Sequence, residues 1–271
     1  MSKIDKLLAG AALAGTAYVL SIKGRTGHPG LKKLQGWNYA HRGLHGEGVP
    51  ENSMKAFRLA VEQGYGAELD VHLLADGNLA VIHDSKLIRT TGAEGRIEDL
   101  TADQLKDYHL EGTEETIPLF SDVLALFEGK APLIIELKVE NNNEQLCTAV
   151  AKLLDHYKGD YCVESFHPQV LGWFKKYRPN TVRGQLTENY FRSKDNKLPP
   201  ALKFILTHQL LNFATSPDFV AYNCRDLDSI SNTVARKVWN MQGVTWTLRT
   251  REQYDEAVDQ NWLPIFENFK P

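Results

Sequence analysis

The chain has 271 residues, of which 42% are hydrophobic and 24% charged. This composition excludes a disordered chain and one that lies wholly in a membrane, and the length suits one or two domains. Lys and Arg number 31 against 34 Asp and Glu, a formal net charge of −3. Because a nucleic-acid-binding protein needs a positive field, we expect no nucleic acid as a partner. Three scattered cysteines argue against a disulfide framework, a zinc cluster and a CxxC redox pair, and we interpret them as buried apolar residues.

Residues 7–22 form an uncharged apolar run with two lysines before it and Lys23 and Arg25 after it. As a helix the run is about 24 Å long, slightly short of a bilayer core. Three interpretations stay open: an uncleaved membrane anchor, which we favour, a signal peptide cleaved before Tyr18, and an apolar helix packed on the folded domain. Basic residues flank both ends of the run, so they do not indicate which side of a membrane the rest of the chain faces.

Residues 23–36 are rich in Gly and Lys and contain one Pro, a composition typical of a linker. We therefore divide the chain into two parts. The N-terminal part, residues 1–36, comprises the apolar helix and the linker. The globular domain comprises residues 37–271.

From residue 37 onward, short apolar runs alternate with helical patterns. We expect strands at residues 37–40, 67–73, 133–137, 161–165, 181–186, 219–222, 244–248 and 264–266, with a short extended piece at 79–82 after the turn at 76–77. We expect helices at residues 53–63, 121–127, 144–156, 168–177, 201–213, 229–239 and 251–259, the first of them capped by Asn52 or Ser53. Alternation of this kind, with eight strands and seven helices, predicts an α/β fold, a (β/α)8 TIM barrel preceded by the apolar helix. Residues 85–118 fit no βα unit, so we expect a small insertion there, after the second strand.

Polar residues at the carboxyl ends of barrel strands point into the site where the βα loops converge. His41 and Arg42 close the first predicted strand. A histidine exchanges protons near neutral pH, and an arginine can bind a phosphate through two hydrogen bonds. The pair therefore suits an anionic substrate, although an ordinary surface loop is an alternative.

Glu68 and Asp70 lie two residues apart on the second predicted strand and so share one of its faces. Two such carboxylates repel each other unless a cation lies between them, which indicates a hard divalent metal such as Mg or Ca. His72 continues this face, but we assign it no metal role because a hard cation prefers oxygen ligands. The alternative is a solvated strand face.

Two further clusters follow along the chain. His83, followed by Asp84, is a second candidate acid/base group or else an ordinary turn histidine. Glu136 follows an apolar run directly, so it is expected to point into the pocket and complete the metal shell. Lys138 shares its face and could neutralise phosphate charge, unless the two form a buried structural pair.

Together these clusters place three carboxylates, two histidines and two cations at predicted strand ends. A metal-assisted phosphoryl-transfer site needs this combination. The sequence contains no GxxxxGK[ST], HExxH or GxSxG motif, which argues against nucleotide hydrolases, zincin proteases and α/β-hydrolases.

Six motifs also occur in a characteristic order and spacing: HRG at 41–43, PENS at 50–53, ELDV at 68–71 with DG at 76–77, HD at 83–84, ELK at 136–138 and SF at 165–166. This order closely resembles that of the glycerophosphodiester phosphodiesterase family, over residues 38–271. The resemblance implies a (β/α)8 barrel in which the stretch after His83 is the family's insertion. It implies hydrolysis of a glycerophosphodiester to an alcohol and glycerol 3-phosphate with Mg or Ca bound. The site residues that it implies are His41 and His83 as acid/base residues, Glu68, Asp70 and Glu136 as metal ligands, and Arg42 and Lys138 facing the phosphate.

The C-terminal part departs from the family. Most members carry a Trp-Thr-Val-Asn strand end and later an Ile-Thr-Asp segment, whereas this chain has WTLR at 246–249 and FEN at 266–268. Arg249 and the Glu267-Asn268 pair therefore leave the identity of the leaving alcohol open. No eighth helix follows the last predicted strand, and we expect residues 26–36 to cover that side.

Three functions stay open. The leading one is metal-dependent hydrolysis of water-soluble glycerophosphodiesters. The second is lysophospholipase D chemistry on a membrane lipid, favoured by the apolar N-terminus and by Phe166 and Trp246, two aromatic residues that we expect to contact the substrate. The third is a catalytically silent binding barrel, which the intact histidines and acids disfavour.

Overall fold

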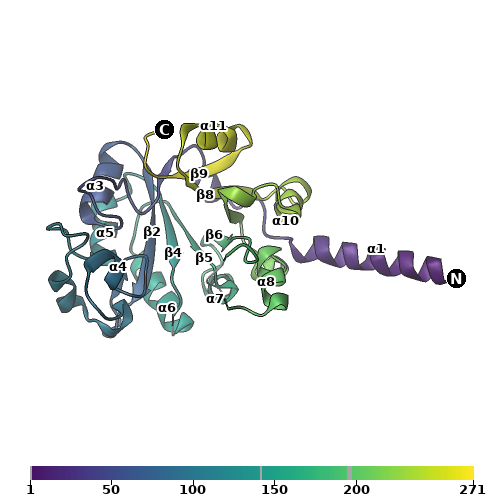
Figure 1. Ribbon diagram of the computed structural model, residues 1–271, viewed down its shortest axis with the longest axis horizontal. Helices are drawn as coiled ribbons and strands as arrows, with labels where there is room; N and C mark the ends of the chain where they lie inside the picture. The colour runs from purple at the N-terminus through teal and green to yellow at the C-terminus, as the bar shows by residue number, and fades with distance from the viewer. Residues whose placement is uncertain (1, 141, 194–196) are drawn as a thin grey trace.

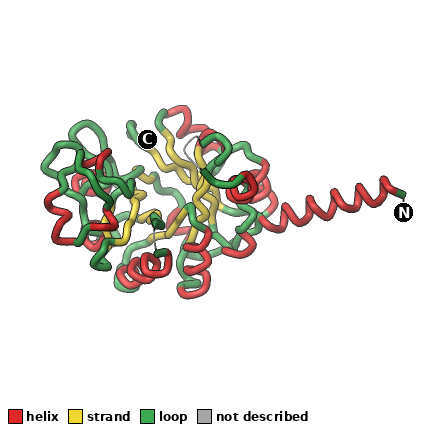
Figure 2. The backbone as a smooth tube through the Cα atoms, turned by 60° about the horizontal axis from the view of Figure 1, so that its bottom comes forward, coloured by secondary structure: helices red, strands yellow, loops and turns green. Residues whose placement is uncertain are grey.

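The computed structural model describes residues 2–140, 142–193 and 197–271. Eight parallel strands close into a barrel because β1 pairs with both β2 and β9 (Figure 1). In spatial order these strands are β1 (Tyr39–Ala40), β2 (Gly66–Leu73), β4 (Leu133–Leu137), β5 (Tyr161–Ser165), β6 (Arg183–Thr187), β7 (Phe219–Asn223), β8 (Gln242–Leu248) and β9 (Trp262–Phe266). Figure 2 shows the strands in the centre of the domain with helices around them. The predicted (β/α)8 TIM barrel is confirmed.

The helices that surround the barrel are α3 (Met54–Glu62), α5 (Phe120–Phe127), α6 (Asn143–Leu154), α7 (Pro168–Tyr177), α8 (Pro200–Thr207), α9 (Asn212–Thr215), α10 (Ile230–Thr233) and α11 (Arg251–Asp259). Ser53 caps α3, as its hydroxyl accepts a hydrogen bond from the backbone N–H of Ala56. The single helix expected at 201–213 is wrong: α8 and α9 are separate, and Gln209 between them has φ of 58°. The helix expected at 229–239 begins as α10 and continues as a π-helical turn, η4 (Val234–Val238).

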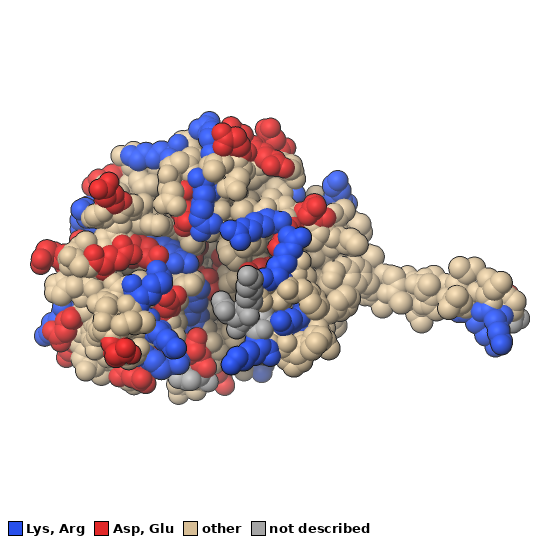
Figure 3. Space-filling view, in the orientation of Figure 1, with Lys and Arg blue, Asp and Glu red and all other residues tan. Residues whose placement is uncertain are grey.

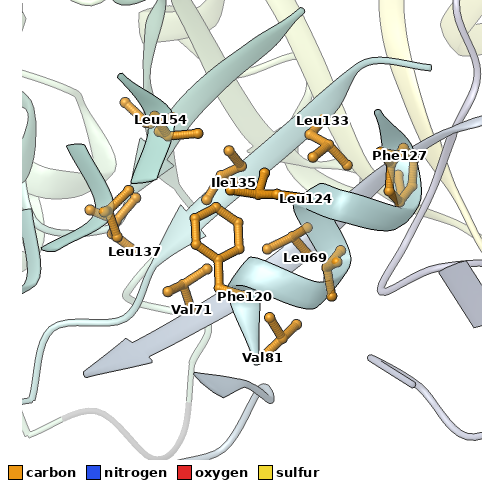
Figure 4. Packing of buried hydrophobic residues seen from close by; sticks show 14 of the residues in the cluster. Leu69, Val71, Val81, Phe120, Leu124, Phe127, Leu133, Ile135, Leu137 and Leu154 are labelled. Carbon is orange, nitrogen blue, oxygen red and sulfur yellow. The ribbon is translucent and has the colours of Figure 1, made fainter. Parts of the chain in front are cut away.

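Side chains of a strand alternate between its two faces, and this alternation positions the site. Leu69 and Val71 of β2 and Leu133, Ile135 and Leu137 of β4 all belong to one buried cluster with α5 and α6 (Figure 4). Each buried side chain of this size contributes about 1.5–3 kcal/mol. The acidic residues between them in the sequence consequently face the inside of the barrel.

The insertion has a small core of its own. It contains β3 (Leu79–Val81), which pairs antiparallel with β2, then α4 (Ile88–Thr91), η1 (Ile97–Asp99) and η2 (Ala102–Asp107). His72 on β2 lies beside the insertion residue Glu98, with 2.7 Å between Nδ1 and Oε1, and its Nε2 donates to the carbonyl oxygen of His83 at 3.2 Å. His72 thus fastens the insertion to the barrel.

The helix α1 (Lys3–Ser21) extends away from the barrel, and none of its residues is buried (Figure 1). In Figure 3 it carries no charged side chain except near its free end. Only the end next to the barrel docks: Ile22 is fully buried, and the Trp239 indole N–H donates to the Val19 carbonyl at 2.8 Å. The interpretation of the whole run as a helix packed on the domain is therefore wrong.

Residues 23–36, expected to be a linker, pack against the barrel. Arg25 pairs with the buried Asp218 at 2.6 Å, just before β7. The short helix α2 (Leu31–Leu34) places Leu34 in the core inside the barrel, where its carbonyl accepts a hydrogen bond from Tyr39. The part of the chain that projects from the barrel therefore ends near residue 22.

Residues 26–36 contact the amino-terminal ends of barrel strands: Lys33 pairs with Asp160, just before β5, at 2.9 Å, and the Gln35 amide donates to Gln242, at the start of β8, at 2.7 Å. They therefore lie at that end of the barrel and not over the side left without an eighth helix. The contacts on that side come instead from the C-terminal segment. The ring of Phe269 lies 5.7 Å from that of Phe266 in β9 and 6.0 Å from that of Tyr254 in α11.

Candidate active site

Three buried carboxylates meet at the carboxyl ends of β2 and β4. Asp70 is the register partner of Glu136 across the two strands, and Glu68 lies two residues earlier on the inner face of β2. Their exposed fractions are 3% for Glu68, 1% for Asp70 and 6% for Glu136, and one oxygen from each lies within 4.8 Å of the others. The predicted metal-ligand set is thus assembled in space.

Two cations lie against this cluster. The ammonium of Lys138 is 3.0 Å from Asp70 Oδ1 and 2.8 Å from Glu136 Oε1, and the Arg42 guanidinium is 3.5 Å from Asp70 Oδ2. Burial and the neighbouring carboxylates raise the pKa of Glu68 well above its usual range. Burial alone would also raise the pKa of Asp70, but Lys138 and Arg42 hold it well below its usual range.

A fourth carboxylate, Glu164 on β5, was not predicted. It is the register partner of Glu136, is 1% exposed, and its Oε2 has no hydrogen-bond partner in the part of the chain that the structure describes. Burial and the charges of Glu136 and Asp70 raise its pKa well above the usual range. The sequence did contain a signal, since Glu164 is an acid within an apolar strand.

Four carboxyl groups lie against only two cations, Lys138 and Arg42, and this excess of acids contributes to the raised pKa values of Glu68 and Glu164. A divalent cation among these groups would favour their ionised forms, and an all-oxygen donor set suits a hard ion. Glu164 Oε2, which is buried and has no hydrogen-bond partner among the described residues, is a free donor atom for such an ion. The residues therefore fit a divalent metal.

The segment 50–53 orients this cluster. The Asn52 amide donates to Asp70 Oδ2 at 2.8 Å, and Asn52 has φ of 54°, a conformation that asparagine tolerates well. Glu51 accepts a hydrogen bond from Arg42 at 2.8 Å, and the backbone N–H of Arg42 donates to Glu68 at 3.0 Å.

His41 lies at the end of β1, where a carboxylate contacts its Nδ1. Glu267 Oε2, at the end of β9, is 2.5 Å from that nitrogen, while the other ring nitrogen of His41 is 3.9 Å from Glu68. Burial lowers the pKa of His41 to about 4, against the opposing effect of the Glu267 hydrogen bond, so the ring is neutral at pH 7. Glu267 in turn accepts a hydrogen bond from Arg249 at 2.6 Å.

A carboxylate also contacts Nδ1 of His83. Its Nδ1 is 2.6 Å from Asp84, and Asp84 also accepts a hydrogen bond from Arg89. The hydrogen bond from His83, together with that from Arg89, holds the pKa of Asp84 below its usual range even though burial opposes the shift. The side chain of His83 is 32% exposed, so it lies at the rim of the site.

These groups border a cavity of about 280 Å³ that has a charged part and an apolar part. Phe166, Leu186, Trp246 and Ile265 form the apolar part. Eight of the nine predicted site residues line the cavity, and Asp70 lies in the carboxylate cluster beside it. Besides Glu164, the prediction missed Glu188, which also lines the cavity, and the supporting residues Glu267 and Arg89.

A family model, the glycerophosphoryl diester phosphodiesterase family, matches residues 41–269. A glycerophosphodiester phosphodiesterase from Bacillus altitudinis is 36% identical over 169 residues, which span 58% of this chain and 69% of the relative. A lysophospholipase D, GDPD1, from Rattus norvegicus is 36% identical over 135 residues, spanning 45% of this chain and 42% of the relative.

Among solved structures, an Oleispira antarctica phosphodiesterase in complex with the product sn-glycerol-3-phosphate superposes with a TM-score of 0.72 at 22% identity, covering 90% of this chain and 95% of that one. A Silicibacter pomeroyi protein described as a glycerophosphoryl diester phosphodiesterase superposes at 0.73 with 19% identity and the same coverages. These two similarities support the barrel fold, and the family match extends over most of the chain. The chain therefore belongs to the glycerophosphoryl diester phosphodiesterase family and is a phosphodiester hydrolase.

Proposed function

We propose that the protein hydrolyses glycerophosphodiesters to an alcohol and glycerol 3-phosphate. The observation that carries the proposal is one cavity bordered by two carboxylate-supported histidines and a buried cluster of carboxyl groups whose oxygens lie close enough to share a metal. The name of the Bacillus altitudinis relative and the product bound to the Oleispira antarctica structure support the same substrate class.

In this proposal Glu68, Asp70 and Glu136 hold one divalent cation, Mg or Ca. When bound, the cation offsets charge on the phosphoryl oxygens and on the attacking oxygen. Lys138 and Arg42 lie beside the same carboxylates, and each can turn a donor toward the phosphate. Substrate binding thus adds two protein cations to the charge that stabilises the transition state.

His41 and His83 exchange the two protons of the reaction. One histidine takes a proton from water as the water attacks phosphorus, and the other donates a proton to the departing alcohol oxygen. A carboxylate accepts the Nδ1 proton of each ring, so Nε2 is the nitrogen left for chemistry. Phe166 and Trp246 contact the organic part of the substrate.

A second candidate substrate is a membrane lysophospholipid, cleaved in the manner of a lysophospholipase D. The rat relative carries that name. The apolar part of the cavity at Phe166 and Trp246 suits a hydrophobic substrate, and α1 suits a membrane location. Hydrolysis at the same phosphodiester bond would use the same histidines.

We also propose that α1 attaches the protein to a membrane, the alternative being secretion after signal cleavage. Within the described part of the chain, α1 is the one helix that is long and apolar enough to cross a bilayer. Its large side chains face solvent, with exposed fractions of 74% for Leu7 and 72% for Leu13. The elements beside its docked end add exposed Phe204, Phe213 and Val238. Leaving this much apolar surface in water is unfavourable, and a lipid bilayer removes that cost.

The test is an assay of purified protein on glycerophosphocholine, glycerophosphoethanolamine and lysophosphatidylcholine, with and without a chelator. We expect glycerol 3-phosphate from the first two substrates and loss of its release with chelator. Cleavage of lysophosphatidylcholine alone would favour the lysophospholipase D function. If none of the three substrates is cleaved even with Mg or Ca added, the catalytically silent binding barrel is the function that remains.

A further inference from the structure

Three strand ends lie side by side where the barrel closes. Phe266 of β9 is the register partner of both Leu248 of β8 and Ala40 of β1. The backbone N–H of Glu267 donates to the Leu248 carbonyl at 2.9 Å. The backbone N–H of His41 donates to the Phe266 carbonyl, also at 2.9 Å. The residue that follows each strand end carries an ionisable side chain, and the three are Arg249, Glu267 and His41.

Glu267 lies between the other two side chains and uses one oxygen for each. Its Oε1 accepts a hydrogen bond from the guanidinium Nε of Arg249 at 2.6 Å, and its Oε2 is 2.5 Å from Nδ1 of His41. The side chain of Arg249 is 49% exposed, whereas those of Glu267 and His41 are 10% and 12% exposed. The contacts therefore run from solvent, through a largely buried carboxylate, to a histidine that lines the cavity.

The contact between Glu267 and His41 determines which ring nitrogen of His41 carries the proton. Burial alone would raise the pKa of Glu267, but the hydrogen bond from His41 and the charge of Arg249 hold it below its usual range, so the group is a carboxylate. Because a carboxylate accepts but does not donate, Nδ1 of His41 carries the proton of the neutral ring. The unprotonated nitrogen is then Nε2, which lies 3.9 Å from Glu68 in the carboxylate cluster.

A metal site is the alternative use of the same carboxylate. Donor atoms of His41, His45 and Glu267 lie within 4.8 Å of one another, a spacing that a metal could use. However, the guanidinium of Arg249 already binds Glu267, and a second cation beside it is disfavoured because like charges repel. His45 Nε2 is 3.7 Å from Glu267 Oε2, which is too far for a hydrogen bond. The geometry therefore favours His41 as the partner of this carboxylate.

We infer that Arg249 and Glu267 are a positioning pair that holds His41 as the Nδ1–H tautomer with Nε2 toward the site. Glu267 binds the ring directly, and Arg249 orients Glu267 through its other oxygen. The effect of both residues on the reaction passes through the imidazole alone. This inference rests on the proposed function, in which His41 transfers a proton.

Nitrogen-15 NMR of the full chain in detergent, with labelled histidines, tests the tautomer without any turnover. Chemical shifts distinguish a protonated from an unprotonated ring nitrogen, and the signals of His41 are those absent from His41→Ala. At pH 7 we expect the proton of His41 on Nδ1. Glu267→Ala should give a mixture of tautomers, because no acceptor then favours Nδ1–H. Glu267→Gln should keep the proton on Nδ1, since its amide oxygen can still accept a hydrogen bond.

Steady-state kinetics on glycerophosphocholine test the consequence for the reaction. We expect Glu267→Ala to lower kcat about 10²-fold, with KM within about twofold and unchanged Mn²⁺ affinity. Glu267→Gln should restore part of the rate, and Arg249→Ala should cause a smaller loss than Glu267→Ala. In a His41→Ala background, Glu267→Ala should cost little more, because residues that act as a unit are not additive.

Two exposed residues provide matched controls. Glu62→Ala, in the last turn of α3, removes an exposed acid, and Arg251→Ala removes an arginine that pairs with exposed Asp255 at 3.0 Å. Both controls should leave kcat and the His41 tautomer unchanged.

A proton on Nε2 in the native chain, or an unchanged tautomer in Glu267→Ala, would overturn this inference whatever the rates. Independent losses that multiply in the double variant, or full activity in Glu267→Ala, would also overturn it. If the native chain hydrolyses no diester, the proposed function fails, and the NMR result alone decides whether the pair positions His41. If Glu267→Ala does not fold, Arg249→Ala gives the same comparisons at a half-exposed site, with a smaller expected change.

Discussion

Each candidate histidine is held at Nδ1 by a carboxylate, which in turn binds an arginine. For His83 the carboxylate is the next residue in the chain, Asp84. For His41 it is Glu267, on the opposite end of the sequence but on the neighbouring strand of the closed barrel. Both rings are therefore prevented from rotating, and both keep the same nitrogen for proton transfer.

The carboxylate cluster gives the first prediction. Asp70→Asn keeps the shape of the side chain but removes a charged oxygen ligand, and Glu136→Gln does the same on β4. We expect each variant to abolish hydrolysis and to weaken Mn²⁺ or Ca²⁺ binding at least about tenfold, measured by calorimetry. Asp122→Asn, at an exposed acid on α5, is the control. Normal turnover with unchanged chelator sensitivity in Asp70→Asn would refute the metal assignment.

The histidines give the second prediction. His41→Ala and His83→Ala should each lower kcat by about 10²-fold or more, since each removes one of two proton transfers. The double variant should lose little beyond the worse single variant. Steady-state kinetics on a soluble diester measure all three. A single variant with near-normal kcat would contradict the paired mechanism.

At the scale of elements, the sequence predicted those features that depend on local pattern. The barrel strands and the four clusters of candidate site residues follow from apolar runs that end in polar residues. The break between α8 and α9 at Gln209 was missed because glutamine carries no turn signal. Glu267 could not be assigned to His41 either, because that contact joins residues 226 positions apart and depends on closure of the barrel.

The start of α3 gives a prediction at this scale. Ser53 accepts from the N–H of Ala56 and donates to the carbonyl of Pro50 at 2.7 Å, so it holds both the helix and the loop before it. We expect Ser53→Ala to lower the free energy of unfolding by about 1 kcal/mol, measured by urea denaturation. The control, Ser121→Ala, lies in the first turn of α5 without a capping role and should change stability by less than about 0.5 kcal/mol. Equal effects of the two changes would contradict the capping role.

At the scale of the whole molecule, the N-terminal part that packs on the barrel and the part that projects from it have different roles. Residues 22–36 contribute Ile22, Arg25 and Leu34 to buried contacts with the barrel. Residues 3–21 form α1, an apolar helix whose surface is mostly exposed. A cut at residue 36 would therefore remove part of the core, whereas a cut before Tyr18 removes only the exposed part of α1 and keeps the contacts of Tyr18 with His208 and of Val19 with Trp239.

The last prediction compares the full chain with one that starts at Tyr18, so that the docked end of α1 is kept. Every residue assigned to the chemistry lies at or after His41, so we expect both forms to have the same kcat on a water-soluble diester. The full chain should sediment with phosphatidylglycerol–phosphatidylcholine vesicles, and the shortened chain should stay in the supernatant, because residues 3–17 of α1 supply the membrane affinity. The melting temperature should be nearly equal, since none of residues 3–17 is buried and the contacts of Tyr18 and Val19 with the domain are kept. If the full chain is monomeric and soluble without detergent, and the shortened chain melts at a clearly lower temperature, α1 is a structural helix and the membrane proposal is wrong.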